Sequence, residues 1–171
     1  MEQELELARK AAGGDVAAFT ALVRAHEGVV RRFLTRLAGA EGADDLAQEV
    51  FLKAWRLGGD WRGEGSYRSW LMGIAWTQFL GARRANARSR ARDHAAYEQD
   101  PQVDGGPDAA IDLSRALGGL AERERAAVLL CFGEGCSHAE AARIMDVPLG
   151  TLKSIVARGR SALAARLEER S

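Results

Sequence analysis

The chain has 171 residues, and its 24 Lys and Arg side chains are balanced by 24 Asp and Glu side chains. Hydrophobic residues make up 47% of the sequence, which is enough for the cores of one or two small domains. No apolar run is long enough to cross a bilayer, and the acidic start, Met1–Glu4, is unlike a signal peptide. These features exclude a membrane-spanning class, and we expect a cytoplasmic protein with no membrane insertion.

Residues 1–92 are predicted to be helical throughout, because Ala, Leu, Arg and Glu dominate the composition and Pro is scarce. Gly13 and Gly14 end a first helix that begins near Glu4, and Asp15 is a suitable N-cap for a second helix. Apolar residues of the second helix recur at helical spacing and form one stripe, which comprises Phe19, Leu22, Val23, Val30, Phe33, Leu34 and Leu37.

A third helix is predicted from Asp44 to about Leu57, where two glycines follow. Its apolar residues, Val50 among them, face inward. Its opposite face is acidic and polar and carries Asp45, Gln48, Glu49 and Lys53. Such a face is ordinarily solvated, and the alternative is that a protein partner docks on it.

A polar loop over residues 60–66 precedes a fourth helix, which is predicted from about Tyr67 to Arg92 and ends in a run of arginines. Aromatic rings interleaved with basic residues are typical of single-stranded nucleic-acid binding, because bases stack on the rings and phosphates meet the charges. The alternative is that the rings belong to the core, and we adopt it for Trp70. For Trp61 and Trp76 both interpretations stay open. The aromatic residues concerned are Trp61, Tyr67, Trp70, Trp76 and Phe79.

Residues 93–110 carry five acidic and no basic side chains, with few large apolar residues. This composition predicts a flexible acidic linker, either a plain connector or a regulatory element, between a domain at 1–92 and a domain at 111–171. The first domain carries 15 basic and 11 acidic side chains, and the second carries nine and eight. We expect weak binding to DNA by the free chain, because proteins that bind DNA unaided usually have a larger basic excess.

The segment from Ser137 to Arg160 has the pattern of a helix-turn-helix, whose second helix enters the DNA major groove. Ser137 and Glu140 have the spacing of a capping box, and Pro148 limits the first helix because residues before proline avoid the α region. In the second helix, one face is apolar and the other carries Lys153, Ser154 and Arg158. The alternative is an ordinary helical hairpin with a solvated basic face.

Catalysis is not expected, because no nucleophile–base grouping, phosphate-binding glycine loop or paired carboxylates stand in a suitable context. Cys131, Cys136 and His138 supply three candidate zinc ligands, whereas a closed structural site uses four. We therefore expect no metal and no cofactor, and two reduced thiols.

Three segments, in this order along the chain, resemble bacterial sigma factors. Residues 44–55, DDLAQEVFLKAW, resemble region 2.2, and residues 61–71, WRGEGSYRSWL, resemble the start of region 2.3. Residues 148–154, PLGTLKS, resemble the recognition helix of region 4.2. The size is similar to the extracytoplasmic-function group of the sigma-70 family, which keeps only regions 2 and 4. The resemblance covers nearly the whole chain outside the linker and implies an all-α fold of two small helical domains.

The resemblance implies a factor that binds core RNA polymerase and directs promoter-specific initiation, and not an enzyme. The third helix would bind the polymerase β′ coiled coil through Asp45, Gln48 and Glu49. The loop and fourth helix would open and hold the minus-ten element through Trp61, Arg62, Gly63, Ser66, Trp76, Thr77, Arg83, Arg84 and Arg88. The C-terminal helix would read the minus-thirty-five element through Thr151, Lys153, Ser154, Arg158 and Arg160. Promoter DNA, as duplex and as single strand, the β flap and an anti-sigma factor are the further partners it implies.

The sequence also departs from the family pattern. Thr77 and Gly81 stand where many relatives carry Asn and Asp, and Ile155 stands where they often carry Arg. Gly159 predicts early fraying of the recognition helix, since an interior glycine costs about 1 kcal/mol relative to alanine. Two other functions stay open: a free-standing helix-turn-helix regulator that binds duplex DNA as a dimer, and an interaction protein whose helical domains dock protein partners.

Overall fold

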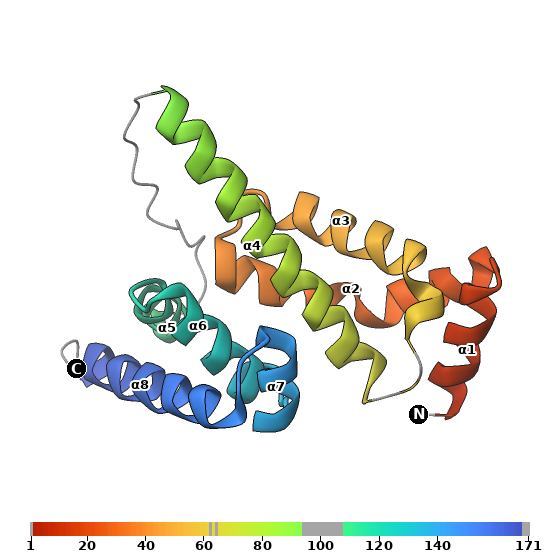
Figure 1. Cartoon of the computed structure of the whole chain (residues 1–171). Helices are drawn as coiled ribbons and strands as arrows, with labels where there is room; N and C mark the ends of the chain where they lie inside the picture. The colour runs from red at the N-terminus through yellow and green to blue at the C-terminus, as the bar shows by residue number, and fades with distance from the viewer. Residues whose placement is uncertain (1, 62, 64, 94–107, 169–171) are drawn as a thin grey trace. The chain divides into compact units, whose positions relative to one another are not determined.

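The computed structural model describes residues 2–61, 63, 65–93 and 108–168, and every regular element in these ranges is helical. They fall into two compact units. The first holds α1, α3, α4 and α2 as far as Arg32, and the second holds the last turns of α2 together with α5 to α8 (Figure 1). The predicted flexible linker lies mostly outside the described residues, and α5 already begins at Asp108. None of the described helices is long and apolar enough to span a membrane.

The first unit begins with α1 (Glu2–Ala12) and α2 (Val16–Ala38), separated by the predicted break at Gly13 and Gly14. Asp15 caps α2 as expected: its Oδ1 accepts the backbone N–H of Ala18 at 3.0 Å. The remaining elements are α3 (Ala43–Arg56), a short 3₁₀ turn η1 (Gly58–Asp60) and the long α4 (Tyr67–Asp93). The helix boundaries predicted from glycine and capping signals are therefore close to those observed.

Aromatic and polar contacts join the helices of the first unit. The ring of Phe19 on α2 lies 4.9 Å from that of Trp55 on α3. His26 on α2 is buried, and its Nε2 lies 2.7 Å from Glu4 Oε1 on α1. The His26 ring also lies 5.5 Å from that of Tyr67, the first residue of α4. His26 thus links α1 and the start of α4 to α2, which holds the loop before α4 in place.

The second unit contains α5 (Asp108–Gly118), α6 (Glu122–Val128), a π-helical turn η2 (Leu129–Gly133), α7 (His138–Met145) and α8 (Leu149–Glu168). Helix α8 packs against α5, α6 and α7, as Figure 1 shows. Its apolar face is buried as predicted, and it comprises Leu152, Ile155 and Val156. The side chain of the buried Arg125 fixes the turn between α5 and α6 by donating hydrogen bonds to the carbonyl oxygens of Gly118 and Leu120.

The helix-turn-helix is present between α7 and α8. The Ser137 hydroxyl accepts the N–H of Glu140 at 3.2 Å, and the Glu140 carboxylate accepts the N–H of Ser137 at 2.9 Å, so the predicted capping box is confirmed. Helix α7 ends at Asp146, which adopts the left-handed conformation (φ 52°, ψ 54°). The chain reverses at that residue, two positions before Pro148, and α8 begins directly after the proline.

The expected fraying at Gly159 is wrong. Helix α8 continues to Glu168, and Gly159 is buried within it. A Cβ at this position would lie 2.8 Å from Val128 Cγ2 and 3.1 Å from the Glu124 carbonyl oxygen of α6. Glycine stands here because α6 and α8 approach so closely that no side chain fits between them, and their packing offsets its low helix propensity.

Candidate protein-binding and nucleic-acid-binding surfaces

The outer face of α3 presents the three polar residues predicted for partner binding. Asp45, Gln48 and Glu49 are all exposed, while the opposite face of the helix is buried through Ala43, Ala47, Val50 and Ala54. Two apolar side chains share the exposed face at helical spacing: Leu52 is 49% exposed and Trp55 is 37% exposed. The sequence prediction omitted Leu52 and Trp55, although a count at intervals of three and four from Gln48 would have found both.

The loop before α4 is shaped by glycines and a serine cap. Gly63 and Gly65 have φ values of 80° and 76°, which side-chain-bearing residues rarely adopt. The Ser66 hydroxyl accepts the N–H of Ser69 at 3.0 Å and so caps α4. Arg62 lies outside the described residues. The loop backbone therefore has its turn geometry built in, and the Ser66 hydroxyl predicted to contact DNA has a structural role.

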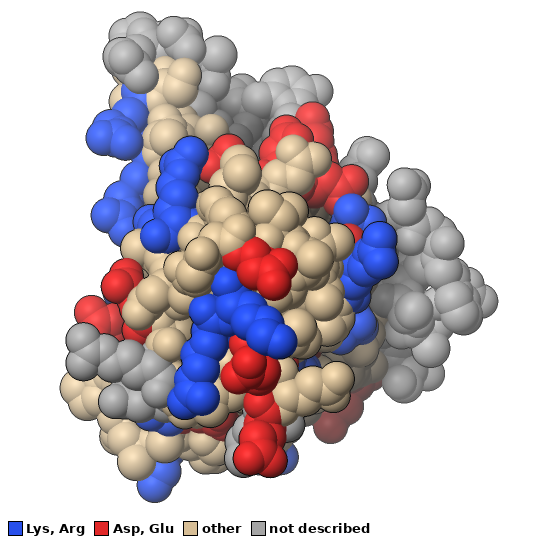
Figure 2. Space-filling view, turned by 90° about the vertical axis from the view of Figure 1, so that its right-hand side faces the viewer, with Lys and Arg blue, Asp and Glu red and all other residues tan. Residues whose placement is uncertain are grey.

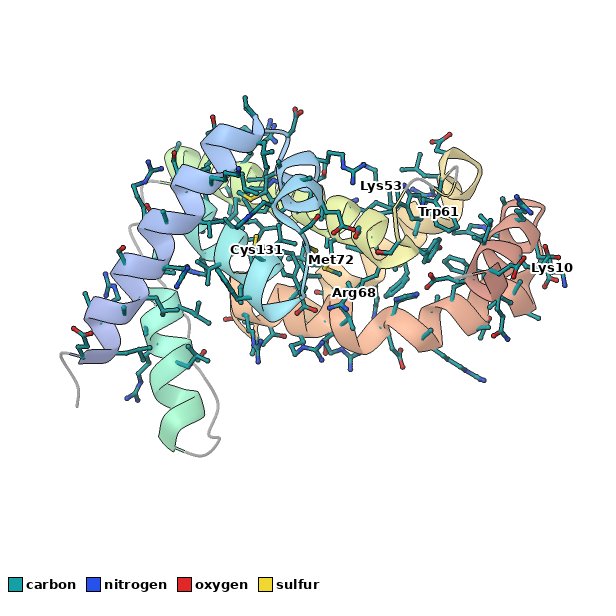
Figure 3. All side chains as sticks on the ribbon, turned by 90° about the horizontal axis from the view of Figure 1, so that it is seen from below. Lys10, Lys53, Trp61, Arg68, Met72 and Cys131 are labelled. Carbon is teal, nitrogen blue, oxygen red and sulfur yellow. The ribbon has the colours of Figure 1, made fainter. Side chains whose placement is uncertain are left out.

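Trp61, labelled in Figure 3, stands at the start of this loop and is partly buried. Its ring meets the ring of Tyr67 edge-on, with centroids 5.1 Å apart and planes at 83°. Its indole N–H is buried and has no hydrogen-bond partner among the described residues. Tyr67 is itself buried, and burial, followed by the nearby charge of Glu4, raises the pKa of its phenol to about 12. Tyr67 therefore supports Trp61 as a neutral ring.

Of the residues on α4 predicted to contact nucleic acid, four are exposed and one is buried. Thr77 is exposed, and its hydroxyl donates to the Gly73 carbonyl oxygen one turn earlier, at 2.9 Å. Arg83, Arg84 and Arg88 are exposed along the second half of the helix. Trp76, however, is only 3% exposed, and its ring stacks on Phe79 with centroids 5.7 Å apart. The structure thus places Trp76 in the packed interior, so its expected role as a minus-ten contact is wrong.

Helix α8 exposes all five residues predicted to contact DNA, namely Thr151, Lys153, Ser154, Arg158 and Arg160. Two of them are held by neighbouring elements of the same unit. The Nε of Arg158 lies 3.4 Å from Glu124 Oε1 on α6, and the Arg160 guanidinium lies 5.3 Å from the ring centre of the exposed Phe132 in η2. The Ser154 hydroxyl donates to the Gly150 carbonyl oxygen at 3.1 Å. The helix therefore presents a polar, partly pre-ordered face.

The surface charge is mixed. On the face drawn in Figure 2, acidic and basic side chains are interspersed.

Cys136 is buried, and Cys131 is partly buried with a thiol pKa raised by that burial. Within the described residues, no group of three or more His, Cys, Asp and Glu side chains could hold a metal ion.

Comparison with known proteins connects these surfaces to a family. The family model described as Sigma-70 region 2 matches residues 22–89, and the one described as Sigma-70, region 4 matches residues 110–163. The chain is 34% identical over 167 residues to the ECF RNA polymerase sigma factor SigC of Mycobacterium tuberculosis, which covers 95% of this chain and 90% of that protein. It is 36% identical over 170 residues to SigM of the same species, covering 96% and 84%.

A solved structure agrees with these sequence matches. The sigma factor RpoE in complex with the anti-sigma factor NepR, from Bartonella quintana, superposes with a TM-score of 0.79 and 26% identity, over 90% of this chain and 98% of that one. Two helical domains of these two kinds define a promoter-recognition factor, which directs the start of transcription and is not an enzyme. The chain belongs to the extracytoplasmic-function (ECF) group of the sigma-70 family of RNA polymerase sigma factors. The alternative of a free-standing dimeric regulator is set aside by this membership.

Proposed function

We propose that the chain joins core RNA polymerase in the cytoplasm through the exposed face of α3, which docks on the β′ coiled coil. Asp45, Gln48 and Glu49 supply the polar contacts, and Leu52 and Trp55 extend the same face with apolar surface. Exposed apolar side chains flanked by polar ones are typical of interface centres and rims. This arrangement supports a docking role for the face better than a purely solvated one.

For the minus-ten element, we assign the loop before α4 and the outer side of α4. A base of the opened strand leaves the stack at this loop. Trp61, Gly63 and Ser66 contact the strand there, and Arg62 contributes a positive charge. Thr77 continues this surface along α4, and Arg83, Arg84 and Arg88 meet the phosphates. Trp76 lies on the buried side of α4, where its ring stacks on Phe79 of the same helix, and it has no role in DNA contact.

For the minus-thirty-five element, we assign the exposed face of α8. Lys153, Ser154 and Arg158 face base edges in the major groove, and Thr151 and Arg160 face phosphates. The β flap of the polymerase binds this C-terminal domain and fixes its separation from the N-terminal domain. Because the whole chain has no net charge, we expect promoter binding to depend on this assembly. An anti-sigma factor, as in the complex of the Bartonella relative, is the proposed regulator.

The observation that carries the proposal is the exposure of all five predicted DNA-contacting residues on α8, opposite its buried face. The experiment is transcription in vitro by core polymerase and the purified chain on a fragmented genomic library, with start sites sequenced. We expect start sites that share two upstream elements, and scattered starts equal to those of core polymerase alone would refute the proposal.

A further inference from the structure

Glu124 on α6 and Arg158 on α8 form a contact between two helices of the second unit. Arg158 belongs to the face of α8 assigned to DNA, whereas Glu124 does not. Arg158 Nε lies 3.4 Å from Glu124 Oε1. The arginine side chain is 64% exposed, whereas the glutamate side chain is 22% exposed. The carboxylate is thus the less mobile of the two groups, and it contacts the Nε of Arg158, the guanidinium nitrogen nearest the backbone.

The close approach of α6 and α8 explains why these side chains meet. An added Cβ at Gly159 would lie 3.1 Å from the carbonyl oxygen of Glu124 and 3.3 Å from its Cβ. The missing side chain at residue 159 therefore lets the first turn of α6 lie directly against α8, next to Arg158. Glu124 sits in that first turn, where the helix macrodipole favours a negative charge.

The contact with Glu124 involves Nε and leaves the terminal Nη1 and Nη2 groups of Arg158 available to contact DNA. A guanidinium carries five N–H donors, and the Nε–H that faces Glu124 is only one of them. The terminal Nη1 and Nη2 groups still present a fork of parallel donors, which matches the O6 and N7 acceptors of guanine in the major groove. A free arginine side chain loses substantial rotamer freedom when it binds, and a carboxylate that already restrains it reduces that loss.

We propose that Glu124 is a positioning residue for Arg158, which it holds so that the terminal N–H pair faces a guanine edge in the minus-thirty-five element. The inference rests on the base-reading role proposed for Arg158. It adds that sequence selectivity at one promoter position depends on an α6 carboxylate that does not itself contact DNA.

The test uses holoenzyme assembled from core polymerase and the full chain, on a promoter library with a randomised minus-thirty-five element. Arg158→Ala identifies the base position that this arginine reads. Glu124→Ala is expected to reduce the preference at that same position by about 1.4- to fivefold, the range measured for exposed ion pairs. Glu124→Gln keeps an acceptor for Nε and is expected to retain most of the preference. In Arg158→Ala, adding Glu124→Ala is expected to change nothing further.

Glu122→Ala is the matched control, because it removes the same charge from the same turn of α6. Thermal unfolding of each variant checks the fold. Equal loss at every promoter, or a gain in promoter use, with Glu124→Ala would overturn the positioning role. If Arg158→Ala shifts one position and Glu124→Ala leaves it unchanged, the positioning role alone fails. If Arg158→Ala alters no base preference, the base-reading role fails first, and the inference fails with it.

Discussion

The indole ring of Trp61 rests edge-on against the phenol ring of Tyr67, with centroids 5.1 Å apart. Tyr67 also contacts Trp70, at 5.2 Å, and His26, at 5.5 Å. The loop assigned to the opened DNA strand is therefore anchored at its first residue by an aromatic cluster of the domain core. Such edge-to-face pairs contribute about 0.5–1.5 kcal/mol beyond the area they bury.

The raised pKa of Tyr67 predicts a loss of stability at high pH. Its phenol has a pKa of about 12 in the folded protein against 10.0 as the ordinary value, so folding favours the protonated form. The contribution is complete below pH 10 and is lost as the pH rises from 10 to 12, by up to about 2 kcal/mol. Urea unfolding across this range measures it. Tyr67→Phe should lack this part of the pH dependence, and an unchanged slope in that variant would contradict the assignment.

The capping box at α7 predicts a local stability effect. Ser137→Ala removes the hydroxyl that accepts the Glu140 N–H and should lower the free energy of unfolding by about 1 kcal/mol. Glu140→Gln is the control, because glutamine can still reach back to the Ser137 N–H. Urea midpoints of the two variants distinguish the cases, and a larger loss for Glu140→Gln than for Ser137→Ala would disprove the account.

The packing of Gly159 predicts that alanine is harmful there. Gly159→Ala places a methyl 2.8 Å from Val128 Cγ2, and overpacking of this kind costs about 1–3 kcal/mol. Gly150→Ala in the same helix is the control: nothing lies within 4 Å of its added Cβ, so higher helix propensity should leave stability unchanged or slightly greater. Thermal unfolding of both variants decides the matter, and equal melting temperatures would mean that α6 shifts at no cost.

The exposed lysine of α8 predicts an effect on promoter use. Lys153→Ala should reduce transcription from promoters with an intact upstream element by about fivefold or more, because a good base contact contributes about 1–3 kcal/mol of discrimination. Lys10→Ala removes the same charge from the exposed surface of α1 and serves as control. Run-off transcription on matched and scrambled upstream elements measures the effect. An equal reduction on both templates would argue for a general electrostatic role.

The α3 face predicts loss of polymerase binding without loss of fold. Asp45→Ala combined with Gln48→Ala should abolish co-purification with core polymerase, and Leu52→Ser should weaken it, because each removes contacts from one exposed face. Glu27→Ala on the exposed side of α2 is the control. Circular dichroism confirms that each variant is folded. Normal co-purification of the double variant would move the polymerase contact elsewhere.

Local signals in the sequence were sufficient for most of the fold. Asp15, the glycine breaks, and the Ser137–Glu140 pair act within one turn of the chain, so helix boundaries followed from them directly. The proline accounts for the end of α7 only in part, because the left-handed conformation of Asp146 already ends the helix two residues before it.

The errors concern residues whose role depends on contacts distant in sequence. Gly159 reads as a weak point in its own helix, and only the position of α6 shows it to be a packing site. Trp76 is followed by the polar residues Thr77 and Gln78, yet the folded domain leaves it only 3% exposed. The contact between Glu124 and Arg158 joins residues 34 positions apart, and no local pattern announces it.

The interspersed acidic and basic side chains also bear on the behaviour of the protein before it meets its polymerase. A chromosome offers on the order of a million or more non-specific sites, which sequester any strongly cationic protein. A molecule without net charge has little attraction for that bulk. We therefore expect non-specific DNA to sequester little of the free protein.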